Sequence, residues 1–174
     1  NTESNKLADK TSDTPLTGDA DLLKISGVKS RRRTLYFGKS SIHNWGMFTR
    51  EAIPAEDPII EYLGEIVGQT VAEKREKDYT AHGIGSSFLF RLDHDRVIDA
   101  THCGTIARFL NHSCEPNSYA KIVNVDGQKR IFVFTKRAVG VNEELTFDYK
   151  FPREEGSKKI PCLCGAEKCR IFLN

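Results

Sequence analysis

Apolar residues along this chain occur in short runs or alternate with polar ones, and they seldom recur at helical spacing. Such stretches, when they are bounded by Gly, Pro, Asn or Asp, are typical of β-strands. Four of them are Thr34–Phe37, Gly46–Phe48, Pro58–Leu63 and Phe88–Leu92. The pattern therefore predicts a β-rich chain with short strands.

The clearest local prediction is a β-hairpin in the second half of the chain. The runs 119–125 and 129–135 flank the dipeptide formed by Asp126 and Gly127. Both residue types tolerate positive φ, which a tight hairpin turn requires. We therefore expect two antiparallel strands to meet at this turn.

Helical signals are fewer. Thr70 and Glu73 have the spacing of a capping box, and good helix formers continue from there to Tyr79. Since Val71 and Tyr79 are the only large apolar residues of this segment, we expect a surface helix. A second short helix is predicted over Thr105–Leu110, and it would lead into a polar loop.

The first 30 residues differ from the rest of the chain. They contain few large apolar side chains, so burial cannot offset the entropy lost on ordering them. We expect residues 1–30 to form a flexible lead-in. The basic run Arg31–Arg33 follows, and we interpret it as part of a solvated linker; the alternative is a docking site for nucleic acid or an acidic partner.

Composition limits the classes of protein that fit. A length of 174 residues suits one domain with a tail. The net charge of +2 comes from 26 basic and 24 acidic residues, so no global field draws the chain to DNA or to an anionic membrane. No apolar run approaches the roughly 18 residues of a membrane span, and the polar amino terminus is unlike a signal peptide. We expect a soluble chain without a membrane partner.

Five cysteines indicate a metal site near the carboxy terminus. Cys162, Cys164 and Cys169 lie close together in sequence, and Cys114 can supply a fourth ligand. Four thiolates at Zn–S distances of about 2.3 Å make a tetrahedral zinc site. A disulfide or unligated thiols are the alternatives, but the spacing favours metal. Cys103 is left over, and we expect it to be a small buried side chain.

The polar loop after the second predicted helix contains His112 and Cys114. A Cys/His nucleophilic pair is one interpretation of this spacing. However, side chains so close in sequence on an extended loop rarely face one another, and a metal-bound thiolate is not free to attack. We therefore favour separate roles for these two residues.

Three motifs, taken together, resemble those of SET-domain protein lysine methyltransferases. Arg108–Cys114 resembles the family's RF[IL]NHSC motif, Glu143–Tyr149 its EELT[YF]DY motif, and Cys162–Cys169 its post-SET zinc motif. The likeness extends over residues 31 to 174. It implies a SET domain over 31–150 and a post-SET zinc-binding segment over 151–174, after the lead-in.

Further stretches resemble one branch of this family. Residues 42–46, 83–87 and 172–174 are similar to the COMPASS-type and mixed-lineage-leukaemia enzymes, which methylate histone H3 lysine-4. The resemblance implies a nuclear, chromatin-associated enzyme that acts on the histone H3 tail of the nucleosome. It also implies WD-repeat and SPRY-domain partner subunits in a COMPASS-like complex.

The resemblance implies a mainly β fold, the β-clip SET fold of small sheets with few short helices. In its pseudoknot-like crossing, the segment around Asn111 and His112 passes beside the segment around Tyr149. S-adenosylmethionine would lie on one face, and the target lysine would enter from the opposite face. The residues implied for cofactor binding are His43, Trp45, Asn111, His112, Tyr149 and Leu163. The implied zinc ligands are Cys114, Cys162, Cys164 and Cys169.

The resemblance also assigns residues to the reaction itself. Tyr149 matches the catalytic tyrosine, which orients the amine and the methyl donor, and Tyr62 matches a wall of the lysine channel. Phe147 occupies the phenylalanine/tyrosine switch, which predicts di- and trimethylated products. Phe88 stands where close relatives usually have a tyrosine that contacts cofactor and lysine.

Two alternatives remain. Phe88 is the residue that supports a histone-tail binding or scaffold module with impaired catalysis. The other alternative is a SET enzyme that acts on a non-histone protein.

Overall fold

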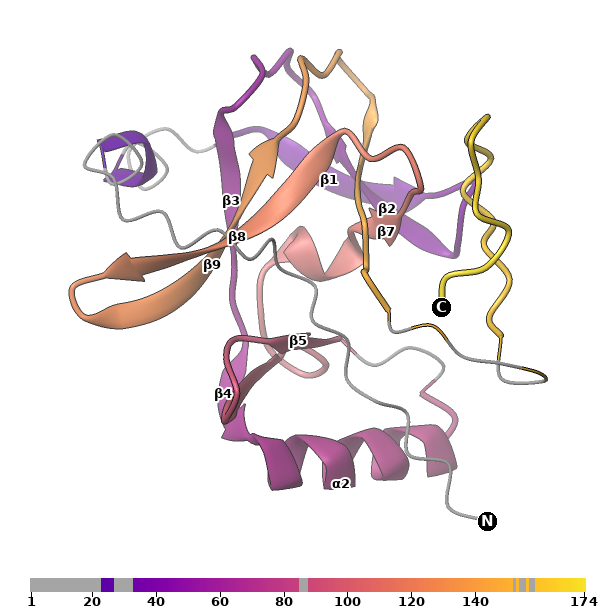
Figure 1. Ribbon diagram of the computed structural model, residues 1–174. Helices are drawn as coiled ribbons and strands as arrows, with labels where there is room; N and C mark the ends of the chain where they lie inside the picture. The colour runs from indigo at the N-terminus through magenta and orange to yellow at the C-terminus, as the bar shows by residue number, and fades with distance from the viewer. Residues whose placement is uncertain (1–22, 27–32, 85–87, 152, 154–155, 157–158) are drawn as a thin grey trace.

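The structure is a computed structural model that describes residues 23–26, 33–84, 88–151, 153, 156 and 159–174. Within these residues, ten short strands form three small sheets, and helices are few. Figure 1 shows two sheets in the upper part of the molecule and the third, with helix α2, in the lower part. The predicted mainly β fold of small sheets is confirmed.

The first sheet joins segments that are far apart in sequence. In spatial order, its strands are β1 (Leu35–Lys39), β2 (Trp45–Thr49), β10 (Glu144–Phe147) and β7 (Asn111–His112). Strand β7 runs parallel to β10, with Asn111 opposite Thr146 and His112 opposite Phe147. The prediction of a loop starting at residue 111 is therefore wrong, because β10 gives the backbone of these residues a partner.

A short helix leads into β7. It is the 3-10 helix η1 (Ile106–Phe109), which lies within the segment predicted to be helical. A single 3-10 turn suits this position, because such turns are common as short connectors between other elements. The prediction of a short helix here is confirmed.

The second sheet contains the predicted hairpin. Its strands are, in spatial order, β3 (Pro58–Tyr62), β9 (Gln128–Thr135) and β8 (Ser118–Val125). Strands β8 and β9 are antiparallel and joined at Asp126 and Gly127, whose φ angles are 51° and 76°. Positive φ at both turn positions is the conformation that this dipeptide favours. The hairpin prediction is confirmed.

The central strand β9 is buried on both faces. Ile131 and Val133 belong to the main core, whereas Phe132 and Phe134 belong to a second apolar cluster with Val123. Alternate side chains of a strand point to opposite faces, so the continuous apolar run of β9 requires cover on both sides.

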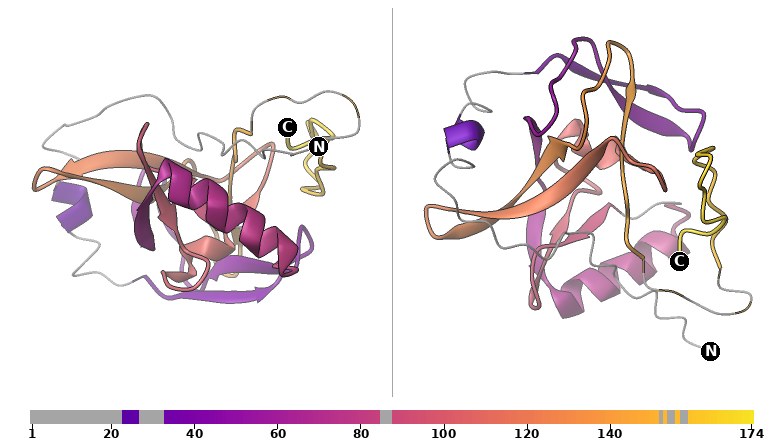
Figure 2. Two further views of the ribbon diagram at one scale, coloured as in Figure 1. Left: turned by 90° about the horizontal axis from the view of Figure 1, so that it is seen from below. Right: turned by 45° about the horizontal axis from the view of Figure 1, so that its top comes forward.

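The second face of β9 is covered by a part of the expected lead-in. Residues 23–26 form a helical turn beside the hairpin (Figure 2), and Ile25 packs in the second cluster with 4% of its surface exposed. This short segment is thus held by apolar burial, which the expectation of a flexible lead-in did not include. Residues 1–22 and 27–30 lie outside the described part of the chain.

Arg33 corrects the interpretation of the basic run. Its side chain is only 7% exposed, and its guanidinium donates to Glu51 Oε2 at 3.1 Å and also pairs with Asp57. The interpretation as a solvated linker is therefore wrong at Arg33, because its side chain is buried and two partly exposed carboxylates pair with its charge. Arg31 and Arg32 lie outside the described residues.

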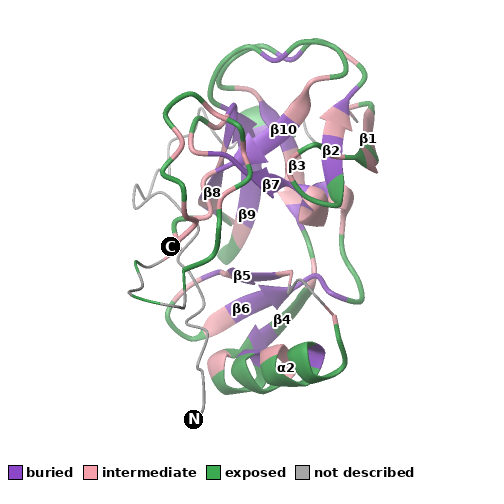
Figure 3. Ribbon diagram, turned by 90° about the vertical axis from the view of Figure 1, so that its right-hand side faces the viewer, coloured by how far each residue is buried: buried purple, intermediate pink, exposed green. Residues whose placement is uncertain are grey.

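The third sheet supports helix α2. Its strands are β4 (Glu65–Gly68), β6 (Arg96–Asp99) and β5 (Leu89–Arg91), in this spatial order. Helix α2 (Gln69–Ala81) packs on β4 and β6 through Ala72 and Tyr79, while the rest of it is largely exposed (Figure 3). The prediction of a surface helix is confirmed. In the described part of the chain, no helix has the length and apolar character needed to cross a bilayer.

The predicted capping box is wrong. Helix α2 begins at Gln69, its N-cap is Gly68, and no side chain caps it. Strand β4 runs directly into the helix, so Thr70 already lies inside the first turn. Gln69 Nε2 instead donates to Glu73 Oε1 at 2.7 Å along the helix surface.

Ile25→Ala should destabilise the chain by about 2–5 kcal/mol, because it leaves a cavity over the second face of the hairpin. Leu23→Ala is the matched control, since Leu23 lies in the same turn and is 74% exposed. The control should change the free energy of unfolding by less than about 0.5 kcal/mol. Urea denaturation measures both values. Equal effects of the two changes would contradict the burial of Ile25.

Candidate active site

The parallel pairing of β7 and β10 brings the first two motifs together. Tyr149 follows β10, and its backbone N–H donates to His112 Nδ1 at 3.1 Å. The Tyr149 hydroxyl donates to the carbonyl of Leu110 at 2.9 Å. Tyr149 thus joins its own segment to the segment around His112, almost forty residues earlier, through its backbone N–H and its hydroxyl.

Asn117, which was not among the predicted site residues, strengthens this junction. Its Nδ2 donates to the Glu144 carbonyl at 2.7 Å, and its Oδ1 accepts from the Thr146 N–H at 2.9 Å. A buried amide side chain therefore pairs with the backbone of β10 as a neighbouring strand would. The turn formed by the residues before it, with Pro116, is the sequence signal that could have indicated a fixed side chain here.

His112 is buried at the centre of the junction. Because Nδ1 accepts a hydrogen bond, the proton of the neutral ring resides on Nε2, which lies 3.4 Å from Cys114 Sγ. Burial lowers the pKa of His112 to about 4; Asp148 opposes this shift and Arg170 adds to it. The ring is therefore neutral at physiological pH.

His112 and Cys114 face one another, although we expected that they would not. Strand β7 ends at His112, and the chain that follows places the Cys114 thiol beside the His112 ring. The contact links the junction to the cysteine cluster. It does not make Cys114 a free nucleophile, because the other three clustered thiols surround the same sulfur.

The side-chain amide of Asn111 contacts the backbone of two other predicted cofactor residues, His43 and Trp45. Its Nδ2 lies 3.2 Å from the carbonyl of His43 and 3.0 Å from that of Trp45. Trp45 is 42% exposed and His43 is exposed, whereas Asn111 is buried. The predicted set thus combines one buried polar anchor with two side chains at the surface.

An aromatic row leads away from this junction. Ring centroids are 5.0 Å apart from Tyr62 to Phe90, 5.8 Å from Phe90 to Phe147, and 5.0 Å from Phe147 to Tyr149. Three predicted catalytic residues therefore share one row, and Phe90 connects them. Phe90 was not among the predicted site residues, although its place in an apolar run of alternating aromatic residues was a signal.

Both tyrosines of the row stay protonated. The Tyr62 hydroxyl donates to the carbonyl of Phe88 at 2.9 Å. Burial raises the pKa of Tyr62 and of Tyr149, and the nearby charge of Glu144 raises that of Tyr149 further. At neutral pH, these groups therefore act as hydrogen-bond donors and not as bases.

Phe88 contributes to the row through its backbone. Its side chain lies edge-on to Phe109, with centroids 6.2 Å apart, and under the guanidinium of Arg108 at 4.7 Å. The structure thus places the Phe88 ring on the η1 side of the row, partly buried against the main core.

The four predicted metal ligands lie together. The Sγ atoms of Cys114, Cys162, Cys164 and Cys169 are all within 4.8 Å of one another, and none forms a disulfide. Cys114 Sγ lies 3.7 Å from that of Cys162 and 4.0 Å from that of Cys169. Tetrahedral coordination at 2.3 Å requires sulfur separations of about 3.8 Å. The cluster therefore fits a metal ion.

Backbone groups around the cluster support charged sulfurs. The N–H groups of Arg170 and Ile171 donate to the Sγ atoms of Cys114 and Cys169, each at 3.3 Å. Such hydrogen bonds stabilise thiolates and orient them as ligands. Leu163 lies between two thiols of the cluster and is 62% exposed. Cys103 is exposed as well, so the prediction that it is buried is wrong.

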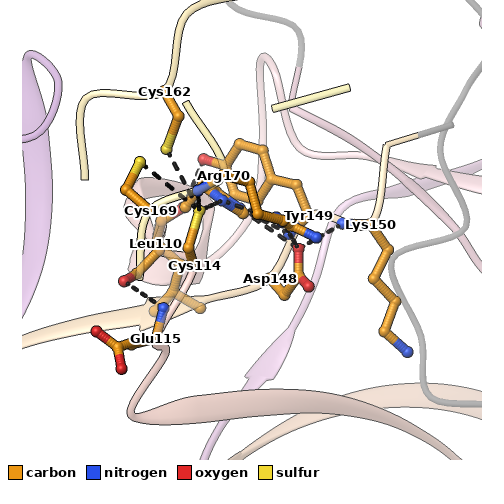
Figure 4. Close-up of polar contacts among 11 residues, drawn as sticks. Leu110, Cys114, Glu115, Asp148, Tyr149, Lys150, Cys162, Cys169 and Arg170 are labelled. Carbon is orange, nitrogen blue, oxygen red and sulfur yellow. Dashed lines mark hydrogen bonds and ion pairs between the residues drawn. The ribbon is translucent and has the colours of Figure 1, made fainter. Parts of the chain in front are cut away.

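Arg170 makes a second link between the tail and the junction (Figure 4). Its Nη2 donates to Asp148 Oδ1 at 2.7 Å and lies 3.4 Å from His112 Nε2. Burial raises the pKa of Asp148, but hydrogen bonds from Lys150 N–H and Arg170 outweigh this effect and lower it. The ion pair is therefore charged at neutral pH. Arg170 was not among the predicted site residues.

Comparison with known protein families identifies the class of protein to which this site belongs. The family model of the SET domain matches residues 44–150. The chain therefore belongs to the SET-domain family.

Curated relatives support the same assignment. The chain is 54% identical over 156 residues to human histone-lysine N-methyltransferase SETD1A, with 90% of the chain and 9% of the relative covered. It is 55% identical over 156 residues to SETD1B of Xenopus laevis, with 90% and 8% covered. For SETD1 of Drosophila melanogaster, the values are 52% over 157 residues, with 90% and 9% covered. The chain thus spans less than a tenth of the length of these relatives.

The cysteine cluster predicts that the purified chain carries about one equivalent of a divalent metal ion. Replacing Cys162, Cys164 and Cys169 together by Ser should abolish metal binding, because too few soft ligands remain. Cys103→Ser is the control, and it should leave the metal content unchanged. Elemental mass spectrometry of the three proteins measures the metal. A metal-free wild type with disulfides among these cysteines would overturn the prediction.

Proposed function

We propose that this chain is the catalytic domain of an S-adenosylmethionine-dependent protein-lysine N-methyltransferase that acts on histone H3 lysine-4. It would serve as the catalytic subunit of a COMPASS-like complex on chromatin in the nucleus. The observation that supports this most is the aromatic row that ends at Tyr149 beside Asn111 and His112. The SET-domain match and the names of the SETD1 relatives support the same reaction.

The reaction asks the protein to align two groups. The sulfur–methyl bond breaks, its electron pair stays on sulfur, and the lysine nitrogen forms the new bond with its lone pair. Donor and acceptor must therefore be in line at about 3–3.5 Å, and the amine must already have lost its proton. Burial of the amine beside the aromatic row would remove it from water, which disfavours the ammonium form and lowers the lysine pKa from about 10.4.

Tyr149 and Tyr62 would orient the amine. Their hydroxyls are protonated, so neither can take the proton of the substrate as a tyrosinate. The proton instead leaves to solvent before transfer, helped by the apolar row. Phe147 adds bulk without a hydroxyl, which leaves space for an amine that already carries methyl groups.

The cofactor would be held by the residues around the junction. We propose His43, Trp45, Asn111, His112, Tyr149 and Leu163 as its contacts. The amide hydrogens of Asn111 are directed to acceptors of the protein, so Oδ1 is its remaining acceptor for a cationic group. The neutral ring of His112 adds no positive charge beside a sulfonium.

Zinc is the metal that we propose for the thiol cluster. Thiolate ligands favour zinc among the common divalent ions, and four ligands without an open position are typical of a structural site. Such a site has no position for substrate. It would hold the tail, including Leu163, against the junction.

The proposed partners come from the resemblance to the COMPASS-type branch. They are the histone H3 tail in the nucleosome, and WD-repeat and SPRY-domain subunits. Stretches 42–46 and 172–174 carry part of this likeness, whereas the stretch 83–87 lies partly outside the described residues.

Product masses test the proposed function. The chain with its core partners, S-adenosylmethionine and a histone H3 tail peptide should form mono-, di- and trimethyl products in sequence. Phe147→Tyr should stop the series mainly at monomethyl-lysine, because the added hydroxyl occupies space beside the amine. Mass spectrometry of the peptide over time measures both.

A peptide with arginine in place of lysine-4 is the control, and it should gain no mass. If cofactor binds but no peptide is methylated under any condition, the scaffold alternative is favoured. If the control peptide is methylated equally, the lysine-4 assignment fails.

A further inference from the structure

The carboxylate of Glu144 lies between two segments of the proposed cofactor site, strand β7 with Asn111 and the loop that begins at Ser40. Glu144 Oε1 accepts from Asn111 Nδ2 at 2.8 Å on one side. On the other side, the Ser40 hydroxyl donates to the same carboxylate, at 2.8 Å to Oε1 and 2.9 Å to Oε2. One charged group thus joins β7 to the segment after β1.

Ser40 connects the Glu144 carboxylate to the loop that contains His43. Its single hydroxyl proton is directed to Glu144, so its lone pairs are free to accept hydrogen bonds. They accept from the N–H of Ile42 at 2.9 Å and from that of His43 at 3.4 Å. The Ser40 N–H also donates to the Asn44 carbonyl at 3.2 Å, which closes the turn.

Asn111 holds the far end of the same loop. Its amide approaches the carbonyls of His43 and Trp45 as well as Glu144, which makes three acceptors for two protons. The carboxylate offers the closest and the only charged of these acceptors, so it fixes the orientation of the amide. Asn111 Oδ1 is thereby directed away from the loop carbonyls.

Gly46 provides an independent sign that the space is kept for this carboxylate. A Cβ at Gly46 would overlap Oε1 and Cδ of Glu144 and lie 3.1 Å from the Cβ of Ser40. Its φ lies outside the positive range, so the backbone itself does not require glycine here. The absence of a side chain at this position serves the contact between β2 and Glu144.

We infer that Glu144 is a positioning residue that orders the loop from Ser40 to Trp45 and the amide of Asn111 for cofactor binding. The inference rests on the proposed function for the identity of the ligand, and on the described contacts for the ordering itself. Glu144 acts through its neighbours, whereas Tyr149 and the aromatic row, which align the amine, do not depend on the loop.

Three measurements separate these parts. Hydrogen exchange of the Ile42 and His43 amides in the full chain without ligand reads the ordering of the loop. Calorimetry with S-adenosylhomocysteine reads the ligand site. Steady-state kinetics with the histone H3 peptide then divides the effect between the cofactor KM and kcat.

Glu144→Ala should raise exchange at both amides by about tenfold and weaken S-adenosylhomocysteine binding by about tenfold or more, because a charge-assisted acceptor is lost. Cofactor KM should rise with it, while kcat at saturating cofactor stays within about twofold. Glu144→Gln keeps one acceptor and should recover part of the loss. Gly46→Ala, which displaces the carboxylate, should resemble Glu144→Ala.

Glu143→Gln is the matched control. Its carboxylate binds Asn117, Arg137 and the N–H of Gly140, away from the loop. It should change ligand affinity and loop exchange by less than about twofold. Ser40→Ala should mimic Glu144→Ala at the two amides, and the double variant should add little, since both act in one chain of hydrogen bonds.

The outcomes are distinguishable. Unchanged exchange at Ile42 and His43 in Glu144→Ala, or equal losses in Glu143→Gln, would overturn the inference. If the wild-type chain fails to bind S-adenosylhomocysteine while the exchange pattern is as expected, the proposed function fails and the ordering role of Glu144 stands. A fall in kcat with unchanged cofactor KM would also contradict a positioning role at the cofactor.

Discussion

The candidate site depends on one interaction, the parallel pairing of β7 with β10. Two residues of β7 are too few to form a stable strand alone, so side chains complete the junction. Asn117 pairs with the backbone of β10, and Tyr149 bonds to Leu110 with its hydroxyl and to His112 with its N–H. Every predicted catalytic group except Tyr62 and Phe88 lies on or beside these two strands. The geometry of the aromatic row is therefore a consequence of this pairing.

The carboxy-terminal tail closes the same junction from outside. Cys114 lies two residues after the end of β7, so its thiol connects the three thiols of the tail to the junction of β7 and β10. Arg170 adds an ion pair to Asp148, next to Tyr149. The two strands, the tail and the loop that contacts Glu144 thus all meet at the residues around Asn111, His112 and Asp148. In our proposal, metal binding and cofactor binding are for this reason one coupled property.

The sequence predicted local features well where residue type itself restricts the backbone conformation. The turn at Asp126 and Gly127 and the two strands that it joins follow from residue type and pattern. Strands β4, β6 and β10 were not predicted, because each has only two large apolar residues and gains its partners from distant segments. The resemblance named the site residues, but the roles of Phe90, Asn117 and Glu144 depend on which segments meet in space. No local pattern contains that information.

The most direct test of the account is a metal titration of the metal-free chain, with S-adenosylhomocysteine affinity measured at each step. If the tail builds one wall of the cofactor site, the fraction of chains that bind ligand should rise in proportion to metal occupancy and saturate at about one ion per chain. Full ligand affinity before any metal is added would contradict the coupling between the thiol cluster and the junction of β7 and β10.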